Sequence, residues 1–180
     1  MGRPGFKPGW GRHAPPGGFD SHSLPPTLLI AVISVRGFEF PDELHYLVEH
    51  DTWARRDADG RVTVGMTSLG AHISGEFIEF LPKPVGAVIE RDRSLGVLEM
   101  SKVIRAARAP VAGVIVESNA LVTRRARLIN DDPYGEGWLV RLDPSAWERD
   151  IARLVTGAAV APAVEAYMGL LAEAFEQPPP

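Results

Sequence analysis

Cysteine is absent from the 180 residues of the sequence. Disulfides, zinc–thiolate sites, iron–sulfur ligation and a cysteine nucleophile are therefore excluded, and any thiol chemistry must come from a group attached to the chain. Long hydrophobic runs are lacking too, since the apolar segment at residues 27–35 is too short to span a bilayer and no small-residue cleavage site follows it. We therefore expect a cytoplasmic protein that does not associate with membranes.

An excess of basic charge is missing as well. The chain carries 19 Lys and Arg residues against 23 Asp and Glu residues, so its formal net charge of -4 gives no whole-chain footprint for nucleic acid. The motifs GxSxG, Walker A and HExxH do not occur, which leaves no self-contained active site and no metal site. The sequence therefore predicts a non-catalytic protein.

Composition divides the chain into three parts. Residues 1–26 contain six Gly and six Pro, which cannot bury enough apolar area to offset the entropy of ordering, so we expect a disordered tail. Residues 27–143 alternate β-branched residues with Gly and Pro turns, and residues 144–180 change to helical periodicity. The length and the 45% hydrophobic content suit one globular domain with a helical C-terminal extension.

Short apolar segments recur through the middle of the chain at the spacing of strands in a small barrel or sandwich. They read GRVTVGMTS, GEFIEFLPKPVGAVI, SLGVLEMSK, PVAGVIVESN and GWLVRL. The runs on either side of Lys102 predict neighbouring strands, and the stretch between them predicts an exposed turn. The sequence therefore places this lysine where other proteins can reach it.

Two longer stretches carry a family pattern. FPDELHYLVEHDTWARRDADGRVTVGMT contains Leu-x-Tyr, Glu-His, Trp and a Val-Thr-Val-Gly strand, and LINDDPYGEGWLVRL contains Asn, Asp-Pro-Tyr-Gly and Gly-Trp. Between them, Glu99 precedes Lys102 by three residues, and Pro110 and Gly113 follow. From about residue 40 to residue 143 the chain thus resembles the glycine cleavage H-protein family, in which this layout forms the lipoyl-lysine hairpin.

The resemblance implies a mainly β fold, the lipoyl/biotinyl-type barrel-sandwich hybrid, with flanking C-terminal helices. It implies that a lipoate ligase or lipoyl transferase joins lipoic acid covalently to Lys102. We expect Glu99, three residues before the lysine and beside the turn, to assist recognition by that enzyme, because its carboxylate can pair with a basic pocket. The chain would then be a monomeric lipoyl carrier whose swinging arm shuttles a covalent intermediate between catalytic partners. In glycine cleavage these partners are glycine decarboxylase, aminomethyltransferase and dihydrolipoamide dehydrogenase.

Three alternatives stay open at this stage. The chain also resembles H-like lipoate-binding proteins, which carry sulfur for a heterodisulfide-reductase-like complex in sulfur oxidation. A biotinyl carrier shares the hairpin but has Met on both sides of its lysine, whereas Ser101 and Val103 flank Lys102 and Met100 stands one place too far away. An unmodified interaction module with the same fold is the third alternative.

Two local features predict further details. Residues 90–127 contain eight Lys and Arg residues against four Asp and Glu residues, so we expect Arg105 and Arg108 to lie on an exposed basic docking face near the arm. The motif NDDPYGEGW is rich in turn-forming residues and predicts a structural loop, after which Trp138 re-enters the core at the start of a strand.

Overall fold

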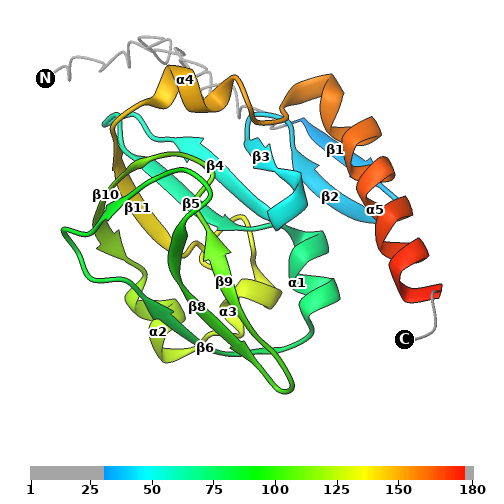
Figure 1. Ribbon diagram of the computed structural model, residues 1–180, viewed down its shortest axis with the longest axis horizontal. Helices are drawn as coiled ribbons and strands as arrows, with labels where there is room; N and C mark the ends of the chain where they lie inside the picture. Colours follow the sequence, from blue (N-terminus) through cyan, green and yellow to red (C-terminus); the bar gives the residue numbers. More distant parts are fainter. Residues whose placement is uncertain (1–30, 177–180) are drawn as a thin grey trace, which may run out of the picture.

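Three antiparallel sheets make up most of the fold in the computed structural model, which describes residues 31–176 (Figure 1). The predicted tail at residues 1–26 lies outside the described residues. The strands are β1 (Val32–Val35), β2 (Phe38–Pro41), β3 (His45–Leu47), β4 (Thr52–Arg56), β5 (Val62–Met66), β6 (Phe77–Pro82), β7 (Val88–Ile89), β8 (Ser94–Met100), β9 (Ile104–Arg108), β10 (Gly113–Ser118) and β11 (Val140–Pro144).

The strand order brings together segments that are distant in the sequence. A six-stranded sheet has the order β3-β4-β5-β11-β10-β7, a three-stranded sheet has the order β6-β8-β9, and β1 pairs with β2. Strand β11 lies between β5 and β10, so the end of the β region completes a sheet that begins near the N-terminal end of the described chain. The prediction of a mainly β fold is therefore confirmed.

Five short or medium α-helices and two 3-10 helices connect and flank these sheets. They are η1 (Val48–His50), α1 (Ser68–Ser74), α2 (Ala120–Arg124), α3 (Leu128–Asp131), α4 (Trp147–Ile151), η2 (Gly157–Ala159) and α5 (Val160–Glu176). Side-chain caps fix two of the starts, because Thr67 accepts a hydrogen bond from Gly70 N–H and Asn119 accepts from Leu121 N–H. Within residues 31–176, no helix has the length and apolar character needed to cross a membrane.

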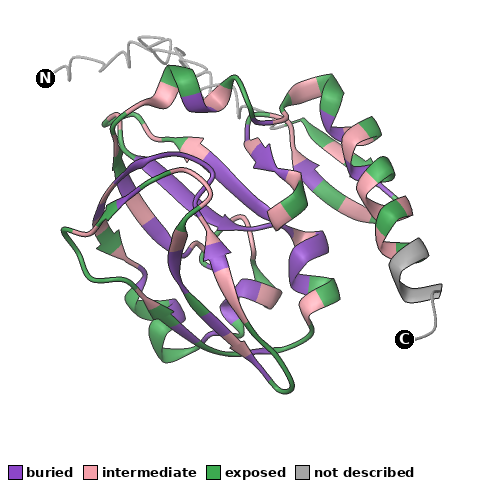
Figure 2. Cartoon of the chain, viewed as in Figure 1, coloured by how far each residue is buried: buried purple, intermediate pink, exposed green. Residues whose placement is uncertain are grey.

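The main hydrophobic core lies between the six-stranded and the three-stranded sheets. Figure 2 shows buried residues along the strands of both sheets. The side chains from the larger sheet include Val62, Val64 and Leu142, and they share one cluster with side chains of the smaller sheet, including Phe80 and Leu98. Burial of these facing side chains therefore holds the three-stranded sheet, which carries Lys102 between β8 and β9, against the rest of the fold.

A second hydrophobic cluster joins the N-terminal strands to the C-terminal helix. Val160 and Val164 of α5 pack with Val35, Phe40 and the aromatic residues of β3 and β4. The chain before α5 is also fixed, because the backbone of Tyr46 exchanges two hydrogen bonds with Val155, at 2.8 and 2.9 Å. The helices beyond residue 144 are thus packed onto the domain, as Figure 1 shows for α5 beside β1 and β2.

The fully buried tryptophan is Trp53, and the expectation that Trp138 returns to the core is met only in part, because Trp138 packs against the second hydrophobic cluster with some of its surface exposed. Trp138 is only half-buried and precedes β11, whose neighbourhood buries Leu139 and Val140 instead. Trp53 is fully buried, and its indole N–H donates to the carbonyls of Met66 at 2.8 Å and Pro133 at 3.1 Å. The ring fits because β5 passes it at Gly65, where a Cβ would approach the indole to 2.5 Å.

Truncating Trp53 should therefore destabilise the protein far more than truncating Trp138. We expect Trp53→Ala to lower the free energy of unfolding by about 3–5 kcal/mol, because it empties a buried site and leaves two carbonyls without a donor. Urea unfolding followed by circular dichroism measures this, with Trp138→Ala as the matched control. Equal losses in the two variants would contradict this assignment of the core tryptophan.

Candidate functional site

Lys102 lies at the tip of the hairpin formed by β8 and β9. The register pairs Glu99 with Ile104, and the turn is closed by a hydrogen bond of 2.9 Å from Met100 N–H to the Val103 carbonyl. Residues 101–104 are all exposed, and the turn projects at the lower edge of the molecule in Figure 1. Among the described residues, no carboxylate forms an ion pair with Lys102. A group attached to its Nζ would therefore extend into solvent.

The outer face of the three-stranded sheet carries Glu99 beside a second glutamate. Glu79 of β6, Glu99 of β8 and Ile104 of β9 lie in one row across the sheet. The next row consists of Leu81, Val97 and Ala106. Glu99 is half-buried and Glu79 is exposed, and two carboxylates directly opposite each other repel. The sequence pattern identified Glu99 but missed Glu79, because only the strand register places the two together.

Arg105 lies on the opposite side of β9, so its expected place on an exposed docking face is wrong. Successive residues of a strand point to opposite faces, and Arg105 points inward while Ile104 points outward. Its guanidinium forms an ion pair of 3.2 Å with Asp51 and donates to Ser74 Oγ at 3.1 Å and to the His50 carbonyl at 3.4 Å. Arg105 therefore anchors the hairpin of β8 and β9, called the arm hairpin below, to η1 and to the end of α1.

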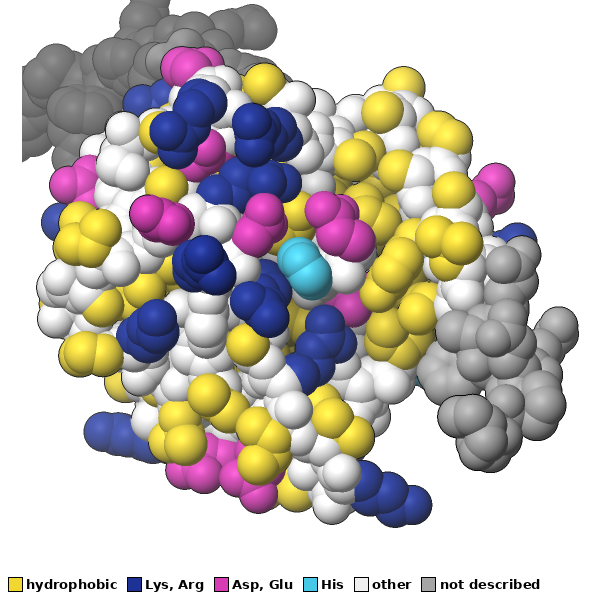
Figure 3. Space-filling view, viewed as in Figure 1, with side chains coloured by type: hydrophobic (Ala, Val, Ile, Leu, Met, Phe, Trp, Pro, Cys, Tyr) yellow, Lys and Arg dark blue, Asp and Glu magenta, His cyan; other side chains and the backbone are white. Residues whose placement is uncertain are grey.

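The other basic residues near the arm do not form a continuous basic face either. Arg108 donates to the Asp92 carbonyl at 3.1 Å, and Arg91 pairs with the Asp92 carboxylate at 2.8 Å. Arg127 pairs with Glu76 at 2.9 Å and with Asp131 at 3.3 Å. Figure 3 shows Lys and Arg side chains interspersed with Asp and Glu over the visible face. The local excess of arginine in the sequence is thus largely paired in the fold.

Asp51 is the buried partner on which this anchor depends. Its side chain is 1% exposed and its backbone has φ of 57°, a left-handed conformation that Asp tolerates better than most residues. Burial raises the pKa of the Asp51 carboxyl, and the Arg105 guanidinium opposes that shift. The phenol of Tyr167 on α5 donates to Asp51 Oδ2 at 3.2 Å, so the C-terminal helix joins the same cluster. Sequence reasoning missed both Asp51 and Tyr167.

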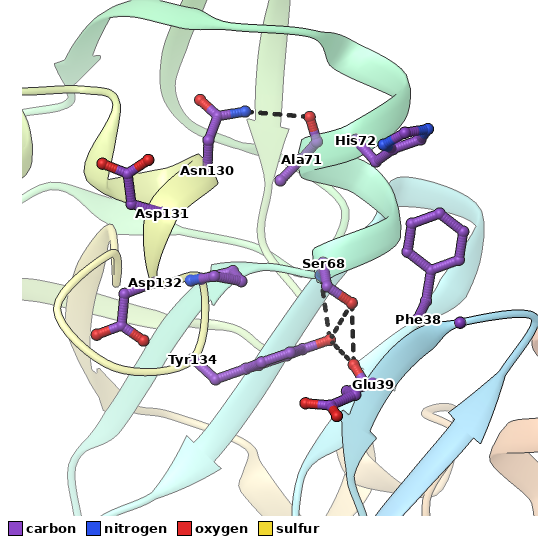
Figure 4. A pocket seen from close by; sticks show the side chains of 11 residues that line it. Phe38, Glu39, Ser68, Ala71, His72, Asn130, Asp131, Asp132 and Tyr134 are labelled. Atoms are coloured by element: carbon purple, nitrogen blue, oxygen red, sulfur yellow. Dashed lines mark hydrogen bonds between the residues drawn. The ribbon is translucent and has the colours of Figure 1, made fainter.

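A hollow with a volume of about 590 Å³ lies between β2, α1 and the loop after α3. Figure 4 shows Tyr134 reaching Ser68 and Glu39. The Tyr134 hydroxyl donates to the Glu39 carbonyl at 2.7 Å, and the Asn130 amide donates to the carbonyls of Ala71 and Gly75. These bonds tie the Asn-Asp-Asp-Pro-Tyr loop to backbone groups, which fits the predicted structural role of this motif.

Two of the three histidines among residues 31–176 pack against aromatic rings. His45 packs edge-on against Trp147 at 5.3 Å between ring centroids, and burial lowers its pKa. His72 packs in the same manner against Phe38 at 5.2 Å. Within residues 31–176, no group of three or more His, Asp or Glu side chains is placed to hold a metal ion. The side chain with a chemical role to explain is therefore Lys102.

Comparisons with known proteins agree on one family. The glycine cleavage H-protein model matches residues 44–167. Glycine cleavage system H protein 2 of Aquifex aeolicus is 38% identical over 122 residues, which cover 68% of this chain and 76% of that protein. The H protein of Mycobacterium tuberculosis is 35% identical over 136 residues, which cover 75% of this chain and 98% of that protein.

A solved structure is similar as well. The crystal structure of a glycine cleavage system H protein from Mycobacterium marinum matches with a TM-score of 0.54 at 32% identity, over 59% of this chain and 87% of that chain. The chain belongs to the glycine cleavage H-protein family, whose members carry lipoate covalently on a lysine. The predicted barrel-sandwich fold and lipoyl cofactor are thereby confirmed.

The environment of Asp51 predicts a pH dependence of stability. Because the folded-state pKa of Asp51 is raised above its usual 3.8, the protonated carboxyl favours folding, and this contribution is lost as the pH rises through the folded-state value. The Asp51→Asn variant lacks this carboxyl, so its free energy of unfolding does not contain this pH-dependent contribution. Its free energy of unfolding relative to the unaltered protein should therefore rise as the pH increases from the ordinary value of 3.8 through the folded-state pKa of Asp51.

Urea unfolding at a series of pH values measures this difference. The relevant quantity is the change in the difference with pH, because the amide also alters the hydrogen bonds to Arg105 and Tyr167. A difference that falls as the pH rises would mean that Arg105 outweighs burial and lowers the pKa of Asp51.

Proposed function

We infer that Lys102 is the residue of this chain that carries the lipoyl group, and that the chain shuttles a covalent intermediate on it between partner enzymes. The exposed lysine at the tip of a closed hairpin supports this assignment most directly. Lys83, the other lysine among the described residues, lies between Pro82 and Pro84, and its backbone N–H is bound to the Leu95 carbonyl at 2.8 Å. Lys7 lies outside the described residues.

The surroundings of Lys102 fit a lipoyl group. The turn offers an amine on a flexible stem, with exposed neighbours on both sides and no described carboxylate that must be displaced. An amide at Nζ removes the positive charge and leaves the backbone of the turn unchanged. When bound, the lipoyl group supplies a cyclic disulfide that opens to two thiols, a chemistry that this cysteine-free chain lacks.

Reach explains why the lysine is placed on a hairpin tip. The lysine stem and the eight-carbon acyl chain together carry the dithiolane roughly 14 Å from the backbone, as ordinary bond lengths dictate. The chain itself presents the arm and supplies a folded body for recognition, while the bond-making groups belong to its partners. Its role is that of a non-catalytic carrier subunit.

The glycine cleavage enzymes are the partners that we assign. Glycine decarboxylase, aminomethyltransferase and dihydrolipoamide dehydrogenase act on the loaded arm, and a lipoate ligase or lipoyl transferase attaches it. The relatives described above are named as glycine cleavage system proteins, and no feature of the hairpin favours the sulfur-carrying alternative over this one. Ser101 and Val103 beside the lysine likewise disfavour biotin.

Glu99 has a proposed role in attachment of the arm. It lies on the outer face of β8, three residues before Lys102, and no described cation is paired with it. A carboxylate in this position suits a basic side chain of the attaching enzyme.

Replacing Lys102 tests the attachment site. We expect Lys102→Arg to fold and to keep the positive charge but to carry no lipoyl group after incubation with a lipoate ligase, lipoate and ATP, because a guanidinium is not acylated under these conditions. Intact mass measures the adduct, and thermal unfolding checks the fold. Lys83→Arg is the control and should be modified as fully as the unaltered chain. An adduct that survives in Lys102→Arg would contradict the assignment.

A further inference from the structure

Several aliphatic side chains at and beside the tip of the arm hairpin are exposed to solvent, and packing within the fold does not explain their presence there. Val103 is 56% exposed and Ile104 is 67% exposed, and both adjoin Lys102. Ile78 is exposed as well, and it lies in the irregular part of β6 where Phe77 and Glu79 pair with Met100 and Glu99. Single exposed aliphatic residues are ordinary, but here two follow the exposed Lys102 in the turn and a third lies on the neighbouring strand β6, beside the end of β8.

The same face also carries the unfavourable pair of carboxylates. Glu79 and Glu99 are cross-strand partners, and a like-charged pair in this position lowers the stability of a sheet. Neither carboxylate has a described hydrogen-bond or ion-pair partner. The face therefore offers an apolar rim and two adjacent negative charges, which together fit a surface with aliphatic side chains and a basic residue.

Distance decides which partner must contact this face. The Nζ atom of an unmodified lysine lies about 6 Å from its Cα, so an enzyme that acts on Nζ has to enclose the turn itself. An enzyme that acts on the dithiolane can stay roughly 14 Å away from the backbone. Val103, Ile104 and Glu99 are one to three residues from Lys102. An enzyme that acts on Nζ must contact these residues, whereas an enzyme that acts on the dithiolane need not.

We propose that Ile78, Glu79, Glu99, Val103 and Ile104 form the docking surface for the enzyme that attaches the lipoyl group. This proposal rests on the assignment of Lys102 as the attachment site. In the reaction, the Lys102 amine attacks the acyl carbon of lipoyl adenylate, the new C–N bond forms, the C–O bond to AMP breaks with its electron pair going to AMP, and the ammonium proton is released. The docking surface holds the turn in place for this transfer.

The test compares the attachment of the lipoyl group with the later reduction of the attached lipoyl group by dihydrolipoamide dehydrogenase. The full chain in its unmodified form is incubated with lipoate ligase and lipoyl adenylate, and kcat/KM for attachment is measured by intact mass. We expect the double variant Val103→Thr, Ile104→Thr to lower kcat/KM about tenfold, because Thr keeps the β-branched shape but removes apolar contact. Val88→Thr is the matched control, since Val88 is 79% exposed but belongs to the six-stranded sheet.

Charge is tested separately on the same face. Glu79→Gln should lower kcat/KM for attachment several-fold and reduce its dependence on salt concentration, whereas Glu43→Gln, an exposed glutamate outside this sheet, should change neither. All variants should keep the melting temperature of the unaltered chain within a few degrees. After prolonged incubation has loaded the arm completely, reduction of the lipoyl group by dihydrolipoamide dehydrogenase and NADH should proceed at the unaltered rate.

The outcomes separate this proposal from the carrier assignment. Unchanged attachment in the Thr and Gln variants, with the adduct still on Lys102, would overturn the docking surface and leave the carrier assignment in place. Attachment and reduction that fall together would mean that both enzymes contact this face, which would overturn its assignment as a surface specific to the attaching enzyme. Absence of any adduct on the unaltered chain would overturn both proposals.

Discussion

The ion pair between Arg105 and Asp51 joins the parts of the structure that the arm depends on. The guanidinium comes from β9, the strand that follows Lys102, and the carboxylate comes from the turn after η1. Ser74 at the end of α1 and Tyr167 on α5 bind the same pair, so four separated segments meet there. Burial of Asp51 makes this interaction costly to break, since an unpaired charge would remain inside the fold. The base of the hairpin is therefore held in place while its tip stays exposed.

Successive side chains of β9 point to opposite faces of the sheet, so this one short strand both anchors the hairpin and presents side chains next to Lys102. Arg105 and Ala107 face the interior, while Ile104 and Ala106 face outward beside the arm. A one-residue shift of this strand would exchange the two sets and would expose the anchor. The register with β8 is fixed by the buried side chains of that strand, such as Leu98. Core packing of β8 thus determines which side chains an approaching enzyme meets.

Local sequence patterns predicted the arm hairpin well, and they failed where contacts are distant in the sequence. Lys102 and Glu99 were found because turn residues and apolar runs act over a few residues. Arg105 was expected in solvent because its partner Asp51 lies 54 residues away in the sequence. Tyr167 of α5, the other side chain bound to Asp51, lies 116 residues from Asp51. Trp138 was expected in the core because it follows a glycine-rich turn, yet it packs against the second hydrophobic cluster with part of its surface exposed, whereas Trp53 is fully buried. Glu79 could not be predicted as the neighbour of Glu99, because only the pairing of β6 with β8 places the two together.

Mass spectrometry of the protein purified from its own cells tests the central claim most directly. Peptides that contain residue 102 should carry a lipoyl adduct on Lys102, and peptides that contain Lys83 should be unmodified. Another lipoylated protein from the same cells serves as the positive control, so that lipoate supply is not limiting. A biotinyl adduct on Lys102, or an unmodified Lys102 beside a fully lipoylated control protein, would contradict the account.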